Sequence, residues 1–484
     1  MQRAGFWLGV GLFAAFLVLP PPDGLSVAGW RTAAVTALMA TWWFTEAVPV
    51  TLTGSLPFLV LPLLGVAKPD AVAGQYMSPV LFLVLGGAVI GLAFEKWDLH
   101  RRMALGVISR AGADPSRLLF AIMAVTAFIS MWVNNSATTV MMIPIATATL
   151  VAVAPSIGTA RPDPDQKRFA AAMVLSIAYA SNIGGVATPI GTPVNPVVIG
   201  ILERNLGIEV SFLQWCLFGV PLLVLALPLC WWILKLTLPF DLPRPEPGAV
   251  AAAIGRTPPM GPPEHRVLAV VGVTCTAWIL LPLLERLIPG ITDAGVAVAG
   301  ALALCVIPSG ERREPSRGRY LIEWADARQA PWYLILLLGG GVALADAVVK
   351  SGLSTWLAQE TQLIAGLPLW LLVLVVALLC ALVTECASNV ATASIFMPIA
   401  ATLASGGGHD PLVVSLAAGL AASWGFANPA GTSSNAIVFG TGRVRVPDML
   451  RSGLLLDLAC ALLITVACIW LVPRLGIAPR IAGP

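Results

Sequence analysis

A cluster of amide and hydroxyl side chains interrupts an apolar stretch of the chain. It spans residues 130–139 and includes Asn134, Asn135 and Ser136. In a hydrocarbon environment a polar group without a partner is costly, so a cluster this dense is expected to line a cavity or to bind a ligand. The alternative is that these side chains only hydrogen-bond neighbouring helices together. A second copy at residues 388–389 favours binding.

A second pattern combines glycine, proline and polar residues, and it also occurs twice, at residues 184–195 and 425–435. Proline and glycine unwind a helix. Unwinding releases carbonyls that suit a small hard cation such as sodium, and it leaves helix N-termini whose N–H groups suit an anion. A plain kink is the alternative for a single copy. Neither pattern contains Lys or Arg, so an anion bound there would depend on neutral dipoles and on cations, which implies cation coupling.

Glu385 lies three residues before Ser388. It is compatible with a proton carrier or a neighbour of sodium, and equally with a carboxylate that merely ends a helix. Other charged residues lie near predicted span ends, where snorkelling or pairing is the ordinary explanation, and we assign them no transport role. They are Glu46, Glu95, Lys96, Asp98 and Asp346.

The two halves of the chain share these patterns at constant spacings. At an offset of 254, Gly86, Asn135 and Pro144 match Gly340, Asn389 and Pro398; at an offset of 240, Gly191, Thr192 and Asn195 match Gly431, Thr432 and Asn435. The change of offset falls in the polar loop around residues 155–168, where length differences are tolerated. Repeated halves with helices broken at matching places are typical of secondary transporters, and we expect the repeats to be inverted.

Composition defines the elements that must position these residues. Of the 484 residues, 58% are hydrophobic and 11% are charged, whereas soluble proteins carry roughly a quarter charged residues. Apolar runs far longer than amphipathic strands predict an all-α polytopic membrane protein rather than a barrel. The apolar run that begins at Phe6 is expected to be a retained first helix.

Several classes of function are excluded by the same composition. A net charge of +3 without a basic cluster gives no surface for nucleic acid. The cysteines lack close CxxC spacing and the three histidines are scattered, so neither a metalloenzyme nor an organic cofactor is expected. An enzyme would also need a nucleophile with a base at membrane depth, and Ser388 beside Glu385 is the nearest approach. A passive anion channel is not favoured either, because it would not require two copies of the same broken helices.

The chain resembles the divalent anion/sodium symporter family, which includes sodium-coupled dicarboxylate, citrate and sulfate transporters. The similarity runs nearly end to end. It is carried by the segments at 42–49, 75–77, 85–87 and 99–102, by two tripeptides that resemble Ser-Asn-Thr, and by two loops that resemble Gly-Thr-Pro-Pro-Asn. As a set these motifs are highly specific.

The resemblance implies two inverted repeats with re-entrant hairpins, divided into scaffold and transport domains, in a homodimer that works by an elevator-like motion. It also implies two sodium sites, one formed by Ser130, Asn134, Asn135 and Gly191 and the other by Thr384, Ala387, Asn389 and Gly431. The substrate carboxylates would meet Asn135, Ser136 and Thr192 from one half and Asn389, Val390, Thr432 and Ser433 from the other.

Three departures from the family pattern bear on the substrate. Asn134 replaces the first serine of one tripeptide and Val390 replaces the threonine of the other, which removes a hydrogen-bond donor. Ser433 and Ser434 stand where the family usually has two prolines. We expect sodium ligation to survive and substrate preference to shift.

The sequence therefore predicts a sodium-coupled symporter of small divalent anions in a bacterial cytoplasmic membrane, with C4-dicarboxylates such as succinate, malate or fumarate first among the substrates. A sulfate or citrate symporter, or a sodium-independent dicarboxylate exchanger, is the alternative. The expected partners are the dianion, the lipid bilayer and a second copy of the chain. The expected organisation is N-terminal helices 1–74, first repeat 75–240, linker 241–265, connecting helices and loop 266–329, second repeat 330–475 and tail 476–484.

Overall fold

The computed structural model describes residues 2–154, 163–245, 249–255, 259–311, 317–360 and 366–475. The expected tail 476–484 and part of the expected linker lie outside these residues. Across the described ranges the chain forms helices and no strand, with only an isolated bridge between Pro308 and Tyr320. The prediction of an all-α protein is confirmed.

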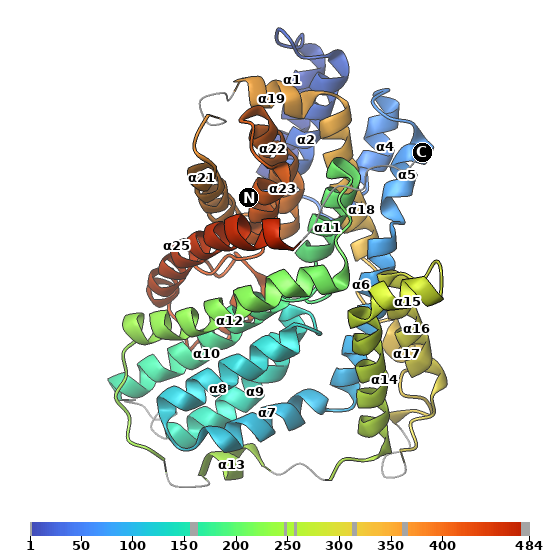
Figure 1. The fold of residues 1–484 in the computed structure, drawn as a ribbon. Coiled ribbons are helices and arrows are strands. Elements are labelled where there is room, and N and C mark those ends of the chain that lie inside the picture. Colours follow the sequence, from blue (N-terminus) through green and yellow to red (C-terminus); the bar gives the residue numbers. More distant parts are fainter. Residues whose placement is uncertain are drawn as a thin grey trace.

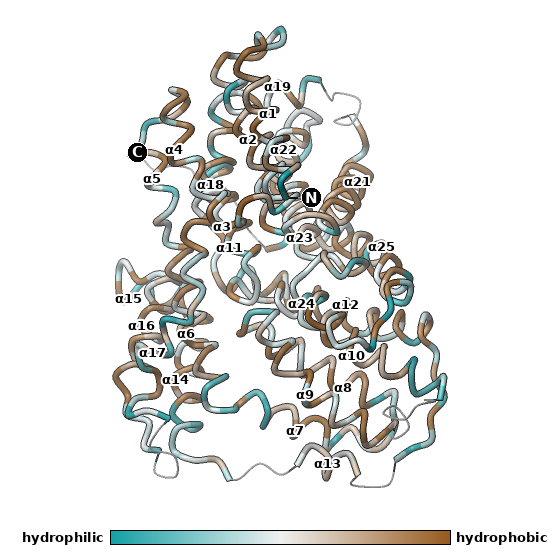
Figure 2. The backbone as a smooth tube through the Cα atoms, turned by 180° about the vertical axis from the view of Figure 1, so that it is seen from behind, coloured by the Kyte–Doolittle hydropathy of each residue, from teal (hydrophilic) through white to brown (hydrophobic). Residues whose placement is uncertain are grey.

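Five helices of the described residues are long and apolar enough to cross a membrane, or seven if each of two bent pairs is one span. Figure 2 shows that apolar residues dominate helices such as α8, α9 and α14, while hydrophilic residues are frequent around α7. Many side chains on the outer surface are large and apolar, including Trp7, Trp232 and Trp470. Such a surface is suited to lipid.

The N-terminal helices and the connecting helices flank the repeats. They are α1 (Gln2–Val18), α2 (Val27–Thr45), α3 (Val50–Thr53), α4 (Leu56–Leu63), α5 (Pro69–Tyr76), α13 (Ala249–Ile254), α14 (Pro262–Ile279), α15 (Leu281–Leu287), α16 (Asp293–Val306) and α17 (Trp324–Ala327). As expected for a helix that is part of the fold, α1 packs on α2, with the rings of Phe6 and Trp42 stacked at 5.1 Å between centroids.

The two repeats contain the same series of helices. The first repeat consists of α6 (Pro79–Lys96), α7 (Leu99–Ala111), α8 (Pro115–Ser130), α9 (Asn135–Val153), α10 (Pro164–Gly185), α11 (Val194–Leu206) and α12 (Phe212–Thr237). The second consists of α18 (Leu334–Lys350), α19 (Leu353–Glu360), α21 (Leu369–Thr384), α22 (Asn389–Gly406), α23 (Pro411–Ala422), α24 (Ser433–Phe439) and α25 (Val446–Leu471). Every helix break predicted from the sequence is present.

Each repeat contains a helical hairpin whose first helix is too short to cross a membrane. The first helices of the hairpins, α8 and α21, have 16 residues each. Such a helix is about 24 Å long, whereas the hydrocarbon layer is roughly 30 Å thick. The hairpin α8–α9 lies in the lower half of the molecule and α21–α22 in the upper half, so the two enter the fold from opposite ends (Figure 1). The expected inverted, re-entrant arrangement is therefore observed.

Short polar signals start the helices that shape the breaks. Asp114, Asp163 and Asp410 each precede a proline and accept a backbone N–H at the start of α8, α10 and α23. Proline is tolerated at the first helical position because an N–H at that position would have no partner within the helix. The aspartate before it accepts one of the free N–H groups of the first turn. Local sequence therefore specifies where these helices begin.

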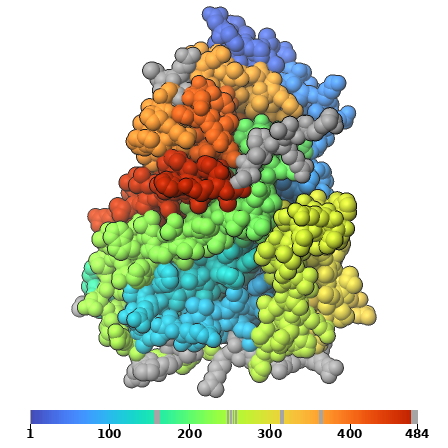
Figure 3. Space-filling model, viewed as in Figure 1, coloured from blue at the N-terminus to red at the C-terminus, as the bar shows by residue number. Residues whose placement is uncertain are grey.

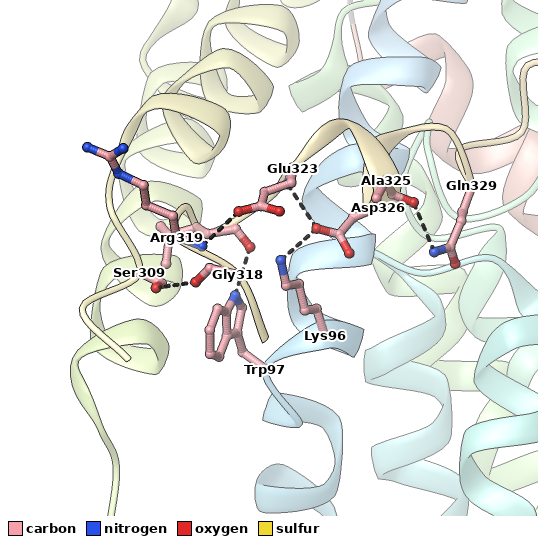
Figure 4. A network of polar contacts seen from close by, with 10 residues as sticks. Lys96, Trp97, Ser309, Gly318, Arg319, Glu323, Ala325, Asp326 and Gln329 are labelled. Atoms are coloured by element: carbon pink, nitrogen blue, oxygen red, sulfur yellow. Dashed lines mark hydrogen bonds and ion pairs between the residues drawn. The ribbon is translucent and has the colours of Figure 1, made fainter. Parts of the chain in front are cut away.

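The first repeat turns a corner between α6 and α7 that is matched in the second repeat between α18 and α19. Asp98 has a positive φ of 52° and Gly352, at an offset of 254, a φ of 80°. In the first repeat the corner is tied to a distant loop, because Lys96 pairs with Asp326 at 2.6 Å and Trp97 donates to the carbonyl of Leu321 (Figure 4). Pairing thus explains the charge of Lys96 at this span end, and Asp98 likewise pairs with Arg317 at 3.1 Å.

The last helices of the repeats, α12 and α25, pack side by side (Figure 3). Behind them the buried Tyr179 of α10 contacts the ring of Phe426 edge-on at 5.2 Å. Its hydroxyl lies 3.2 Å from Oγ of Ser452. These contacts join α10 of the first repeat to the break before α24 and to α25 of the second, and α11 packs on α18, α22 and α23.

Candidate functional site

The tips of both hairpins and both helix breaks surround a cavity of about 630 Å³, which we call the central cavity. The start of α1, the C-terminal end of α2, part of α3 and the start of α18 complete its lining. Its amide and hydroxyl side chains are those of Gln2, Thr45, Thr51, Asn134, Asn135, Ser136, Asn182, Thr192, Tyr333, Ser388, Asn389, Thr432 and Ser433.

At the tip of the first hairpin, oxygen atoms surround the side chain of Asn135. Its Oδ1 accepts a hydrogen bond from Oγ of Ser130 at 2.8 Å and lies 3.2 Å from the carbonyl oxygen of Gly191 and 3.1 Å from that of Ser181. The backbone of Gly191 approaches so closely that a Cβ there would lie 2.7 Å from the carbonyl oxygen of Ser130. Carbonyl, amide and hydroxyl oxygens gathered in this way fit a hard cation.

The second hairpin repeats this geometry. Oγ1 of Thr384 donates to Oδ1 of Asn389 at 2.9 Å and to the carbonyl oxygen of Ala422 at 2.8 Å. Nδ2 of Asn389 lies 3.4 Å from the carbonyl oxygen of Ser423 and donates to it. The pair Thr384–Asn389 thus stands at an offset of 254 from the pair Ser130–Asn135, with nearly the same separation.

The two helix breaks are also held by equivalent hydrogen bonds. In each, one fully buried asparagine donates through Nδ2 to two backbone carbonyls that the unwinding has released. The bonds run from Asn195 to the carbonyls of Gly185 (2.8 Å) and Thr188 (2.6 Å), and from Asn435 to those of Gly425 (2.9 Å) and Asn428 (3.0 Å). Both breaks are therefore ordered structures and not simple kinks.

Glu385 distinguishes the second half from the first. Its carboxylate is buried and accepts the N–H of Ala427 at 2.8 Å and that of Asn428 at 2.6 Å. Asp457 of α25 accepts the neighbouring N–H of Phe426 at 3.2 Å. These contacts match the alternative of a carboxylate that ends a helix, and they hold the second break in place. The matching residue of the first half, Met131, has no charge.

Contacts across the cavity join the two halves. The hydroxyls of Ser136 and Ser433 are 2.5 Å apart, and Nδ2 of Asn182 donates to Oγ1 of Thr432 at 3.0 Å. Oγ of Ser181 donates to Oγ of Ser434 at 3.1 Å. Sequence reasoning missed Ser181 and Asn182, because they lie inside α10 and have no counterpart in the second half.

The structure brings the predicted site residues together in one region. All of the predicted substrate residues line the central cavity: Asn135, Ser136, Thr192, Asn389, Val390, Thr432 and Ser433. Among the predicted sodium ligands, Asn134, Ala387 and Gly431 also line it. Ser130 and Thr384 are fully buried behind the tips, and Gly191 faces an adjoining cavity between α6 and the first hairpin.

The electrostatic character of the central cavity limits what it can bind. Among the described residues its lining contains neither Lys nor Arg, and Glu46 is the one charged side chain there. The helices α9 and α22 begin at Asn135 and Asn389, so their N-terminal N–H groups are at the cavity. Such N-termini favour anions. The described residues contain no group of three His, Cys, Asp or Glu side chains that could hold a metal ion.

Comparison with known proteins identifies a family. The family described as "Sodium:sulfate symporter transmembrane region" matches residues 4–477. A sodium-dependent dicarboxylate transporter, SdcS, from Staphylococcus saprophyticus is 35% identical over 481 residues, which cover 98% of this chain and 92% of the relative. The SdcS of Staphylococcus aureus strain USA300 is 33% identical over 480 residues, which cover 98% of this chain and 91% of the relative.

Two solved structures share the fold at low sequence identity. The YdaH transporter of Alcanivorax borkumensis has a TM-score of 0.58 at 16% identity and covers 99% of each chain. MtrF of Neisseria gonorrhoeae has a TM-score of 0.54 at 15% identity and covers 97% of each chain. Because these identities are low, they indicate a common architecture and nothing about substrate.

The family match confirms the similarity that the motifs indicate, and it agrees with the apolar helices, the broken repeats and the central cavity. We conclude that this chain is a multi-pass integral membrane protein and belongs to the sodium:sulfate symporter family, whose members are transporters and not enzymes.

Proposed function

We propose that this chain is a sodium-coupled symporter of small divalent anions, with C4-dicarboxylates such as succinate, malate or fumarate as the main substrates. The observation that carries the proposal is the duplicated site: two equivalent sets of amide, hydroxyl and carbonyl groups lie at one cavity, and the described residues that line it include no Lys or Arg. The names of the relatives support it, because both SdcS proteins are sodium-dependent dicarboxylate transporters.

In this proposal each half contributes one cation site and one anion contact. Ser130, Asn134, Asn135 and Gly191 form the first cation site, and Thr384, Ala387, Asn389 and Gly431 form the second. Sodium ions bound there supply the positive charge that the cavity lining lacks. The two carboxylates of the substrate accept hydrogen bonds from Asn135, Ser136 and Thr192 on one side and from Asn389, Thr432 and Ser433 on the other, with Val390 in van der Waals contact.

The departures from the family pattern adjust the anion contacts. Val390 has no donor for the substrate, and the hydroxyl of Ser433 adds one, beside Ser136 at 2.5 Å. One donor is lost at Val390 and another is gained at Ser433, so the position of the donor that faces the cavity changes. We propose that this favours a dianion with two separated carboxylates over the more compact sulfate.

We further propose an elevator mechanism in a homodimer. The hairpins and broken helices form a transport domain, and the helices that flank them form a scaffold that contacts the second copy and the bilayer. The family resemblance supports this division. The two matched corners, at Asp98 and Gly352, connect the two kinds of domain in each repeat and are where a motion would be accommodated.

Uptake of radiolabelled succinate into proteoliposomes tests the function. Purified protein is given an inward sodium gradient or an equal potassium gradient, with unlabelled sulfate and citrate as competitors. We expect uptake that requires sodium, and we expect Asn135→Ala and Asn389→Ala to abolish it. Thr149→Val is the matched control, because this buried hydroxyl bonds only to Ile145 within its own helix, at 2.9 Å.

Other outcomes would overturn parts of the proposal. Uptake that is independent of sodium but requires dicarboxylate inside the liposomes would identify an exchanger. It would also refute the assignment of the two cation sites. Strong competition by sulfate or citrate, with weak uptake of succinate, would change the substrate class and leave the coupling intact.

A further inference from the structure

Asn182 is a buried side chain that connects the two halves of the site. It lies in α10, is 1% exposed and lines the central cavity. Its Oδ1 accepts a hydrogen bond from Nδ2 of Asn135 at 3.3 Å, and its Nδ2 donates to Oγ1 of Thr432 at 3.0 Å. Asn182 therefore touches a residue assigned to the first cation site and a residue assigned to the substrate.

The amide of Asn135 has two orientations that suit two different states of the site. With Oδ1 turned toward the hairpin tip, it lies 3.2 Å from the carbonyl oxygen of Gly191 and 3.1 Å from that of Ser181, an arrangement of oxygens that calls for a cation. With the nitrogen in that place, the amide instead donates to both carbonyls and to Oγ of Ser130. Without a cation, the amide of Asn135 can therefore supply hydrogen bonds to these carbonyl oxygens only after it has turned over.

The orientation of the Asn135 amide determines which end of the Asn182 amide must face it. An amide has one donor end and one acceptor end. When Asn135 presents its nitrogen to Asn182, Oδ1 of Asn182 accepts, and Nδ2 is directed to Thr432, as observed. When Asn135 presents its oxygen instead, Asn182 must turn as well, so that Nδ2 faces Asn135 and Oδ1 faces Thr432.

The orientation of Asn182 decides the direction of the Thr432 hydroxyl. Oγ1 of Thr432 already accepts the N–H of Asn435 at 3.1 Å, at the start of α24. In the observed orientation it also accepts from Asn182, so both of its lone pairs are used and its proton is free for an anion in the cavity. In the opposite orientation the hydroxyl proton is donated to Asn182, and a lone pair faces the cavity.

We propose that Asn182 is a positioning residue that links cation occupancy at the first hairpin to anion binding at Thr432, by turning over together with the amide of Asn135. This inference rests on the proposed function and specifies how one cation site acts on the substrate. Coupling between two binding sites requires an element with two discrete states whose equilibrium is shifted by both ligands. The paired amides of Asn135 and Asn182 are such an element, because the cation and the anion both favour the same arrangement.

The described residues of the second half contain no equivalent link. At the offset of 240 the counterpart of Asn182 is Ala422. Nδ2 of Asn389 donates to the backbone carbonyl of Ser423, a group that can only accept. The coupling is therefore one of the features in which the two repeats differ. The backbone of Asn182 is itself fixed, because its carbonyl accepts from the indole of Trp424 at 3.2 Å.

Calorimetric binding to the purified full-length protein tests the link independently of transport. The dissociation constant of succinate is measured at low and saturating sodium chloride, with choline chloride to keep ionic strength constant, and that of sodium is measured without succinate. In the unaltered protein we expect sodium to tighten succinate binding. In Asn182→Leu, which has similar volume and no polar atoms, we expect this sodium effect to fall by about tenfold, within the usual range of coupling between sites.

Two controls separate positioning from a structural role. Sodium binding without succinate should stay within about threefold of the unaltered protein in Asn182→Leu, a change below a typical coupling effect. Thr126→Val, which removes a buried hydroxyl bonded only to Ile122 in α8, should leave both measurements unchanged. If Asn182→Leu does not fold, Asn182→Asp keeps the shape and cannot donate to Thr432, so succinate binding should weaken while sodium binding persists.

A double-mutant cycle with Thr432→Val completes the test. Because both residues belong to one link, the double variant should lose no more sodium dependence than either single variant. Equal sodium dependence in Asn182→Leu and the unaltered protein, or additive losses in the cycle, would overturn the link alone. Succinate binding by the unaltered protein that does not respond to sodium would overturn the proposed function as well.

Discussion

The asparagine in each helix break offers a direct test of the duplicated site. Asn195 and Asn435 are fully buried, and each donates two hydrogen bonds to backbone carbonyls at 2.6–3.0 Å. Asn195→Ala and Asn435→Ala remove these donors. The carbonyls of Thr188 and Asn428 keep a backbone donor, the N–H of Gly191 or Gly431, whereas the carbonyl of Gly185 or Gly425 loses the bond from the asparagine. A net hydrogen bond contributes about 1 kcal/mol, and an unsatisfied buried group costs about 1–3 kcal/mol. We expect each variant to lose about 2–3 kcal/mol.

This loss should appear as weaker substrate binding, because the breaks must be ordered before the substrate can bind. At about 1.4 kcal/mol per factor of ten, the dissociation constant of succinate should rise by roughly 30-fold or more. Calorimetry at saturating sodium measures the constant, and thermal unfolding in detergent follows the stability. Since the two sets of bonds are equivalent, the two variants should give effects of similar size.

The matched control is Asn205→Ala. Asn205 lies in α11, the same helix as Asn195, and neither of its side-chain polar atoms has a hydrogen-bond partner among the described residues. Its removal should change binding by less than about 0.5 kcal/mol. If Asn195→Ala binds succinate and melts like Asn205→Ala, the break is not held by the asparagine and the reasoning is wrong.

Three further predictions concern the cavity and its surroundings. Cys386 is exposed and lines the cavity, so a hydrophilic thiol reagent should block uptake, and succinate with sodium should slow the labelling; equal rates would place the substrate elsewhere. Gly453→Ala should destabilise the protein by about 1–3 kcal/mol through overpacking, because a Cβ there would lie 2.3 Å from Cα of Ala427. Gly272→Ala, with nothing within 4 Å of its Cβ, should be neutral, and equal melting temperatures would refute the contrast. Val390→Thr restores a donor and should lower the KM for succinate about fivefold, worth about 1 kcal/mol; an unchanged KM would show that Val390 does not contact the substrate.

The sequence alone determined the membrane class, the repeats and the positions of the breaks. These features are local. A polar cluster such as 130–139 inside an apolar run cannot face lipid. Proline and glycine mark the breaks only where they occur together with polar residues, because lone prolines such as Pro144 and Pro398 stay inside α9 and α22. The Asp-Pro pairs that start α8, α10 and α23 are local as well. Most of the residues that line the cavity were therefore predictable from motifs.

Only the tertiary structure decided how the halves cooperate. The contacts of Asn182 with Thr432 and of Ser136 with Ser433 join residues 250 and 297 positions apart. Lys96 and Asp326 are likewise 230 positions apart. No local pattern indicates such pairs, because they depend on how the hairpins pack against α10 and the second break.

The same reason explains Glu385. Its position near a hairpin tip was visible in the sequence, but its partners, the N–H groups of Ala427 and Asn428, come from a segment about forty residues away. A carboxylate takes its role from the groups that meet it, and packing alone decides which groups those are.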